Sequence, residues 1–362
     1  MLYYIFYPLH KFLFAFNVFK YITFRSGLAA LTSFILTLVF IPIFIKKVKE
    51  IGAGQNIRRE YCDDLYKLHS IKQGTPTMGG IVIVSSILIS TLLWANFLNR
   101  YILITLFGLI WLAVIGFMDD YIKFSKKRSM GLTLKEKFAA QLFLGLIVGI
   151  FIYLDPYINT KLDVPFIKNE MFSLGIFYLL FVIIVIVGAS NAVNLTDGLD
   201  GLAIGSVIMV ACVYAILSYI TGNIKFSQYL LVPYIQGSGE LAVFCAAMIG
   251  AGLGFLWYNS YPASIFMGDV GSLSLGGAIG IVAILIKKEL LLVIVGGIFF
   301  IEALSVLLQI FSVRLRGRRI FKIAPLHHHF QLTGMHESKV IIRFWIIGII
   351  LMLLTLMTLK LR

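Results

Sequence analysis

Residues 181–187 read Phe-Val-Ile-Ile-Val-Ile-Val, seven apolar side chains in a row inside a longer apolar stretch that runs from residue 173 to residue 190. A strand of a membrane barrel alternates polar and apolar side chains, and this run does not alternate. A helix of roughly 20 apolar residues, in contrast, crosses the hydrocarbon core of a bilayer. The stretch therefore predicts a membrane-spanning helix.

Similar stretches recur along the whole chain. It is 60% hydrophobic and 13% charged, with a mean hydropathy of +0.95, which excludes a water-soluble fold of ordinary composition. We predict an all-α polytopic membrane protein, a single membrane domain over residues 1–362 with about ten spanning helices. The expected spans are 22–45, 76–95, 101–118, 134–153, 173–190, 201–221, 240–258, 270–286, 290–312 and 340–359.

The first 20 residues do not resemble a cleavable signal peptide, because they are aromatic-rich, polar between residues 8 and 11, and lack a small-residue cleavage site. We expect them to lie at the membrane interface. Cys62, Cys212 and Cys245 have no metal-type spacing, and two of them fall in apolar spans, so we assign them no role.

The net charge of +14 is concentrated in three inter-span segments. Residues 46–72, 123–137 and 314–343 carry seven, six and seven Lys or Arg residues respectively. The positive-inside rule places these segments in the cytoplasm, and ten spans then leave both termini outside. The charge also suits a phosphate-bearing substrate and anionic lipid headgroups.

Polar motifs interrupt the apolar chain at the same predicted membrane face. Charge at membrane depth is costly, so this grouping suggests an active site. We expect it to be built from the cytoplasmic loops 46–75, 119–133, 191–200, 259–269 and 313–339.

Acidic residues form the first of these motifs. Asp119 and Asp120 close the third span, with Lys123 one turn later, and Asp269 opens the eighth span. Separately, the pair could mark a solvated helix end and Asp269 a helix N-cap. Together they form a plausible oxygen-ligand site for Mg²⁺, which typically uses one or two carboxylates plus substrate phosphates.

Amide and carboxylate side chains are concentrated between Asn191 and Asp200, which also include Asn194 and Asp197. A simple helix cap needs fewer polar groups. Such groups suit a nucleobase, ribose or sugar, and the glycines allow backbone N–H groups to approach a phosphate. Asn259 is expected on the same face.

Residues 72–80 read Lys-Gln-Gly-Thr-Pro-Thr-Met-Gly-Gly. The segment lacks the Gly-Lys-Ser/Thr ending of a P-loop, which excludes an ATPase of that class. Its simplest reading is a helix start, with Thr75 as cap and Pro76 in the first turn. Lys72 could still neutralise a phosphate.

His327, His328 and His329 follow Pro325. Consecutive residues of a helix do not share one face, which argues against a three-histidine zinc site. Hydrogen bonding to phosphate or proton transfer is easier to reconcile with them. Glu302 falls inside the ninth span, so it should face the bundle interior and have a partner.

Taken in order, the motifs Lys-x-Gly-Thr-Pro-Thr-Met-Gly-Gly, Asp-Asp-x-x-Lys, Asn-Ala-Val-Asn-Leu-Thr-Asp-Gly-Leu-Asp-Gly, Phe-Met-Gly-Asp-Val-Gly-Ser and Ala-Pro-Leu-His-His-His-Phe resemble those of the phospho-N-acetylmuramoyl-pentapeptide transferases. The resemblance covers nearly the whole chain. The wider superfamily of polyprenyl-phosphate N-acetylhexosamine-1-phosphate transferases shares the paired and the later Asp.

This resemblance implies Mg²⁺-dependent transfer of phospho-MurNAc-pentapeptide from its UDP carrier to undecaprenyl phosphate, giving lipid I and UMP at the cytoplasmic face of the bacterial inner membrane. It also implies a homodimer and no nucleic-acid partner. The implied catalytic residues are Asp119, Asp120, Asp269 and His327, with Asp269 as metal ligand and the paired acids as possible further ligands. The implied substrate-binding residues are Lys72, Thr77, Lys123, Asn191, Asn194, Asp197, Asp200, Asn259, Phe266, His328 and His329.

Two positions depart from the family pattern: the segment 60–66 looks longer than usual, and Gln331 stands where an acid is common. Direct attack by the lipid phosphate, with Asp119 as base, is our mechanistic hypothesis; a phospho-enzyme route stays open. A GlcNAc-1-phosphate transferase is the alternative within this chemistry. A secondary transporter is more distant, because it predicts polar groups at mid-membrane and inverted repeats.

Overall fold

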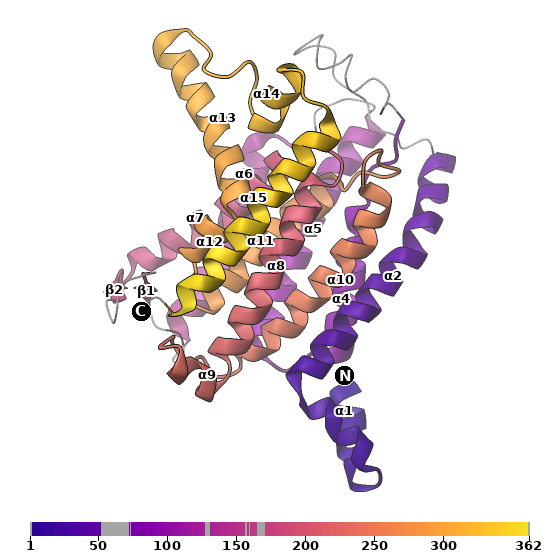
Figure 1. Cartoon of the computed structure of the whole chain (residues 1–362), viewed down its shortest axis with the longest axis vertical. Helices are drawn as coiled ribbons and strands as arrows, with labels where there is room; N and C mark the ends of the chain where they lie inside the picture. The colour runs from indigo at the N-terminus through magenta and orange to yellow at the C-terminus, as the bar shows by residue number, and fades with distance from the viewer. Residues whose placement is uncertain are drawn as a thin grey trace.

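The computed structural model describes residues 2–51, 72, 74–126, 131–155, 158, 160–164 and 171–360. Consecutive long helices run up and down one bundle (Figure 1). We call the upper end in that view, which carries α14 (Leu326–Leu332), the α14 end. The lower end, which carries α9 (Ile224–Tyr229), is the α9 end.

Each expected span overlaps a helix. Nine helices in the described part of the chain are long and apolar enough to cross a membrane, which confirms a polytopic helical membrane protein. The long helices are α2 (Ile22–Ile51), α5 (Arg100–Ser125), α6 (Leu134–Leu154), α7 (Phe177–Thr196), α8 (Leu202–Thr221), α10 (Leu241–Asn259), α11 (Gly268–Leu285), α13 (Gly297–Arg316) and α15 (Glu337–Met357).

The second expected span is shorter than predicted. Helix α4 (Gly80–Trp94) has 15 residues, about 22 Å of helix. Its predicted first turn, with Thr75 as cap, is wrong, because residues 76–79 instead pair with the backbone before α11. Phe266 N donates to Pro76 O at 2.8 Å, and Gly79 N donates to Phe266 O at 2.9 Å.

The ninth expected span is not one continuous helix. It is divided into α12 (Leu291–Val295) and α13 at Gly296 and Gly297. Adjacent glycines are a recognised cause of such breaks, because they add backbone freedom and no packing side chain.

A small β-hairpin at the α9 end is an exception to the all-α prediction. Strand β1 (Lys161–Asp163) pairs antiparallel with β2 (Met171–Ser173), with Leu162 opposite Phe172. Three-residue strands between two spanning helices are too short to leave a clear sequence pattern.

The N-terminal segment forms short helical turns, α1 (Leu2–Phe6), η1 (Tyr7–Lys11) and η2 (Phe14–Lys20), which project beyond the α9 end of the bundle (Figure 1). Phe12 and Phe14 are 88% and 84% exposed. Exposed aromatic side chains suit the interface position that the sequence predicts.

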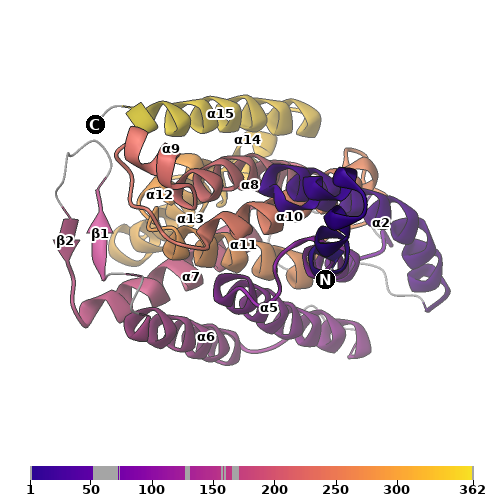
Figure 2. The same cartoon turned by 90° about the horizontal axis from the view of Figure 1, so that it is seen from below.

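Helix α11 occupies the centre of the bundle (Figure 2), where it contacts α4, α5, α7 and α8. All of its residues from Val270 to Leu285 are buried. Its first turn, which holds Asp269, lies at the α14 end, so the central helix presents one carboxylate at that surface.

Buried ion pairs hold the α9 end together. Arg25 of α2, 3% exposed, makes a two-pronged contact with Glu240, at 2.6 and 2.7 Å. Lys288 pairs with Asp163 of the hairpin, and Lys287 lies 3.2 Å from Glu289. We call these three pairs the α9-end pairs.

Short elements η4 (Ser238–Glu240) and η5 (Thr358–Lys360) also lie next to long helices.

Candidate active site

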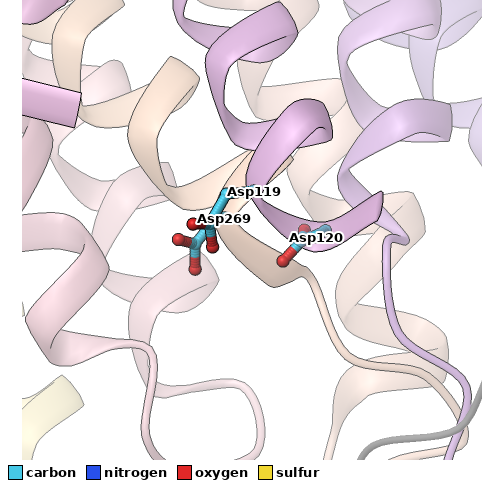
Figure 3. A group of neighbouring side chains, drawn as sticks. All are labelled: Asp119, Asp120 and Asp269. Carbon is cyan, nitrogen blue, oxygen red and sulfur yellow. The ribbon is translucent and has the colours of Figure 1, made fainter. Parts of the chain in front are cut away.

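Three carboxylates meet where α5 ends and α11 begins. Ligand oxygens of Asp119, Asp120 and Asp269 all lie within 4.8 Å of one another. Asp119 and Asp269 lie side by side and Asp120 lies apart from them (Figure 3). We call this group the aspartate centre.

Glycines bring these helices close enough for the aspartates to meet. A Cβ at Gly116 of α5 would lie 2.3 Å from the carbonyl oxygen of Asp269. A Cβ at Gly80 of α4 would lie 2.1 Å from the backbone nitrogen of Gly271. Both distances are impossible for a real side chain, so α4 and α5 contact α11 through their backbones.

Two lysines partly neutralise the aspartate centre. Lys123 Nζ lies 2.6 Å from Asp119, 3.5 Å from Asp120 and 3.4 Å from Asp269. Lys137 Nζ, from the first turn of α6, lies 3.0 Å from Asp119 and 2.5 Å from Asp269. Three carboxylates therefore face two ammonium groups.

Lys137 is a candidate site residue that the sequence analysis missed, because it counted this lysine only as loop charge. The available signal was the Thr133–Glu136 capping box, which is present in the structure and starts α6 at the same end as the motifs. A lysine in the next turn can reach the aspartates.

The aspartate centre has the donor chemistry of a divalent-cation site. All of its ligand atoms are carboxylate oxygens, which Mg²⁺ prefers. Backbone N–H groups also orient two of the acids: Leu132 N donates to Asp119 at 2.7 Å and Val270 N to Asp120 at 3.3 Å. The residues present therefore fit a magnesium ion, and Asp269, 14% exposed at its side chain, is open to a ligand.

Asp197 lies beside the aspartate centre, directly after α7. Burial raises its pKa to about 7, and the charges of Asp269 and Asp120 add to this effect. A carboxylate with that pKa changes charge near neutral pH.

The other polar groups of the 191–200 motif have different surroundings. Asn194 accepts a hydrogen bond from Ser272 of α11 at 2.7 Å, which places it next to the aspartate centre. Asn191 donates to Gln141 of α6 at 2.8 Å. In this structure Asn191 therefore joins two helices.

Lys72 connects the 72–80 segment to the turn after α7. Its Nζ lies 2.7 Å from Asp200 and 2.5 Å from Glu337 of α15. Glu337 also accepts a hydrogen bond from the backbone N–H of Asp200 at 3.1 Å. It was not among the predicted residues. Both carboxylates would have to share Lys72 with any phosphate.

Asn259 and Phe266 shape the loop before α11. Asn259 accepts from Gly201 N at 3.0 Å and donates to Ile265 O at 2.8 Å, so it ties this loop to the start of α8. Phe266 pairs with Pro76 as described above. Thr77 is close by, since a Cβ at Gly268 would lie 3.3 Å from its hydroxyl.

The three histidines of α14 have three different environments. His327 is fully buried, with Nδ1 3.3 Å from Glu302. His328 lies 3.0 Å from Gln331, and His329 accepts from Lys322 N at 3.2 Å. Glu302 thus has the interior partner that its position predicted. The rings of His327 and His328 lie together, with centroids 4.1 Å apart, and a Cβ at Gly198 would lie 2.3 Å from Nε2 of His327 and 3.2 Å from Nε2 of His328.

The structure brings most of the predicted residues to one end, in two adjoining groups. The first is the aspartate centre with Lys123, Asn194 and Asp197. The second combines Lys72, Asp200 and Asn259 with the loop that holds Phe266. His329 lies apart from these groups, with its ring against that of Phe321. The unusual segment 60–66 lies outside the described residues.

Comparison with known proteins gives a consistent result. Residues 102–287 match the model of glycosyl transferase family 4, and residues 72–84 match a phospho-N-acetylmuramoyl-pentapeptide-transferase signature. A phospho-N-acetylmuramoyl-pentapeptide-transferase of Thermodesulfovibrio yellowstonii is 55% identical over 366 residues, and one of Citrifermentans bemidjiense is 53% identical over 362 residues. Each alignment covers 100% of both proteins.

Proposed function

The chain belongs to the phospho-N-acetylmuramoyl-pentapeptide-transferase family, and we propose that the aspartate centre is where it carries out the family's reaction. The protein is a bacterial integral membrane transferase of peptidoglycan synthesis. It transfers phospho-MurNAc-pentapeptide from UDP-MurNAc-pentapeptide to undecaprenyl phosphate, which yields lipid I and UMP. An oxygen of the lipid phosphate forms a bond to the sugar-linked phosphorus, and the bond from that phosphorus to UMP breaks.

The α14 end is proposed to face the cytoplasm, with both termini outside. The support is the distribution of charge, since the three basic segments of the sequence join helices at the α14 end. A cytosolic nucleotide and a membrane-bound lipid phosphate meet at such a surface. A protease or cysteine-labelling assay on intact spheroplasts tests this orientation.

Mg²⁺ is proposed as the cofactor, held by Asp269 with Asp119 and Asp120 as further ligands. The charge balance of the aspartate centre supports this proposal, because in the part of the chain that the structure describes three carboxylates face two lysines. When bound, the ion would neutralise charge on the diphosphate and orient it.

Lys123 and Lys137 are proposed to turn from the aspartates to the phosphates of the substrate. Phosphoryl transfer depends mainly on positioning and on neutralising charge, which two mobile ammonium groups supply. Asn194 and Asp197 lie beside the aspartate centre and are proposed to contact the donor nucleotide or sugar.

Asp119 as the general base stays a hypothesis. Its oxygens lie 2.6 Å from Lys123 and 3.0 Å from Lys137, contacts that favour the anionic carboxylate. A phosphate monoester has a second pKa of about 6, so most of the acceptor needs no base at neutral pH. Trapping a phosphorylated aspartate with donor alone, without lipid acceptor, would contradict direct attack.

A transfer assay tests the function itself. Purified protein is incubated with UDP-MurNAc-pentapeptide and undecaprenyl phosphate, with and without Mg²⁺, and UMP release is measured. We expect release that needs both substrates and the metal. Release with UDP-GlcNAc in place of the muramoyl donor would instead support a GlcNAc-1-phosphate transferase.

Homodimer formation is proposed from the family resemblance. Mass measurement of the protein in nanodiscs tests it, with a monomer mass as the contradicting result.

A further inference from the structure

A buried acid lies behind the histidine motif. Glu302 of α13 and His327 of α14 are both 0% exposed. Glu302 Oε2 lies 3.3 Å from His327 Nδ1, and Oε1 accepts the backbone N–H of His327 at 3.2 Å. One carboxylate therefore contacts both the ring and the main chain of the same histidine.

The opposite edge of the His327 ring faces the turn after α7. A Cβ at Gly198 would lie 2.3 Å from Nε2 of His327, so the ring approaches this turn as closely as glycine permits. Asp197, which directly precedes Gly198, lies beside the aspartate centre. The two ring nitrogens thus point to different places, Nδ1 to Glu302 and Nε2, which is also buried, to the turn at Gly198 beside the candidate substrate site.

A carboxylate in the interior of a membrane bundle is costly and needs a partner. Glu302 has its partner only because α14 lies across α13, so the contact also fixes α14. In proteins generally, the partner of one imidazole nitrogen sets which nitrogen carries the proton and how the ring is oriented.

We propose that Glu302 is a positioning residue for the transfer reaction, which holds the His327 ring with Nδ1 protonated toward Glu302 and Nε2 presented to the substrate phosphates or sugar. This inference rests on the proposed function and names a residue outside the predicted set. It assigns Glu302 no contact with substrate.

A double-mutant cycle tests the proposal in the full-length protein. The variants are Glu302→Met, His327→Gln and the combination, measured for kcat, KM for the nucleotide substrate and Tm. We expect His327→Gln to lower kcat by about 10²-fold and Glu302→Met by at least about tenfold, with KM changed less than about threefold. The combination should be no slower than His327→Gln alone.

Independent action of the two residues would overturn the proposal. In that case the loss of kcat in the combination equals the product of the two single losses. An unchanged kcat in Glu302→Met overturns it as well. If Glu302→Met does not fold, Glu302→Gln replaces it, because its side-chain oxygen can still accept from His327; it should retain more activity than Glu302→Asp, whose shorter chain cannot reach.

Glu289→Gln is the matched control. Glu289 is another buried acid, 2% exposed, which accepts from Tyr178 at the α9 end. We expect this variant to lower Tm without lowering kcat. If Glu302 had only a structural role, Glu302→Met would also lower Tm without lowering kcat. That result would contradict positioning.

A spectroscopic readout separates this proposal from the proposed function. In protein labelled with ¹⁵N-histidine, the His327 signals, identified by their loss in His327→Gln, should show protonated Nδ1 and bare Nε2. Glu302→Met should shift them toward the other tautomer. Signals that do not change overturn positioning even if transfer is observed, whereas a shift without any transfer activity would retain positioning and refute the function.

Discussion

Buried charges lie at both ends of the bundle, and they are balanced differently. At the α9 end three cations, Arg25, Lys287 and Lys288, face three acids, one each. At the α14 end, among the described residues, the three acids of the aspartate centre face two lysines, and Asp197 lies next to them. The two ends lie at opposite ends of α11, about 27 Å of helix apart.

This difference separates stability from function. When one partner of a balanced buried pair is removed, the other charge is left uncompensated, which lowers the free energy of unfolding by several kcal/mol. An unbalanced cluster repels itself, so a cation or a change of protonation state should relieve it. We therefore expect substitutions at the α9 end to change stability and substitutions at the α14 end to change activity.

Asp269→Asn should have the largest effect. It removes the most exposed of the proposed metal-binding carboxylates. Losing several kcal/mol of charge stabilisation in the transition state corresponds to a rate loss of about 10³-fold. Tm should stay the same or rise, because one repelling charge is gone. UMP release and thermal unfolding check this; retained Mg²⁺-dependent turnover would remove the metal role.

Arg25→Met should produce the opposite pattern. It leaves Glu240 without its two-pronged partner in a buried site, which costs about 3–5 kcal/mol of unfolding free energy. The kcat of folded protein should not change. SDS titration of the purified protein measures the stability, and a large fall in kcat would show that the two ends are coupled.

Mg²⁺ should stabilise the α14 end specifically. A ligand at about 100 times its dissociation constant adds about 2.7 kcal/mol to folding. We expect Mg²⁺ to raise Tm of the native protein and of Arg25→Met, but not of Asp269→Asn. An equal rise in all three proteins would place the ion elsewhere.

Asp197 should give the smallest effect, a dependence of stability on pH. Because its pKa is raised to about 7, the folded protein holds this proton more tightly than the unfolded chain does. The resulting stabilisation is complete below the ordinary pKa of aspartate and is lost as the pH rises through about 7. In metal-free protein, Asp197→Asn should therefore lose less stability between about pH 5 and about pH 8. Identical pH profiles for the two proteins would contradict the raised pKa.

Sequence predicts the spans well because apolar length alone decides whether a helix can cross a bilayer. It does not predict the break at Gly296 or the non-helical residues 76–79, since both depend on what packs beside them. The backbone pairing of Pro76 with Phe266 joins segments 190 residues apart, and no local pattern encodes it.

The predicted site residues gather at one end because each motif borders a span at the same membrane face. Lys137 and Glu337 were missed because a charged residue in a basic or terminal segment has many possible roles. Their contacts are with residues distant in the sequence, Asp269 and Lys72 respectively. Glu302 stood out only because an acid inside a span requires an explanation.

The backbone contact between Gly80 and Gly271 has a consequence for how this protein can vary. A Cβ at Gly80 would lie 2.1 Å from the backbone nitrogen of Gly271, so any larger residue there must move α4 away from α11, whereas a larger residue at Gly271 first displaces the side chain of Met267. A complete mutational scan should therefore find Gly80 as intolerant as the aspartates, although it has no side chain to take part in the chemistry.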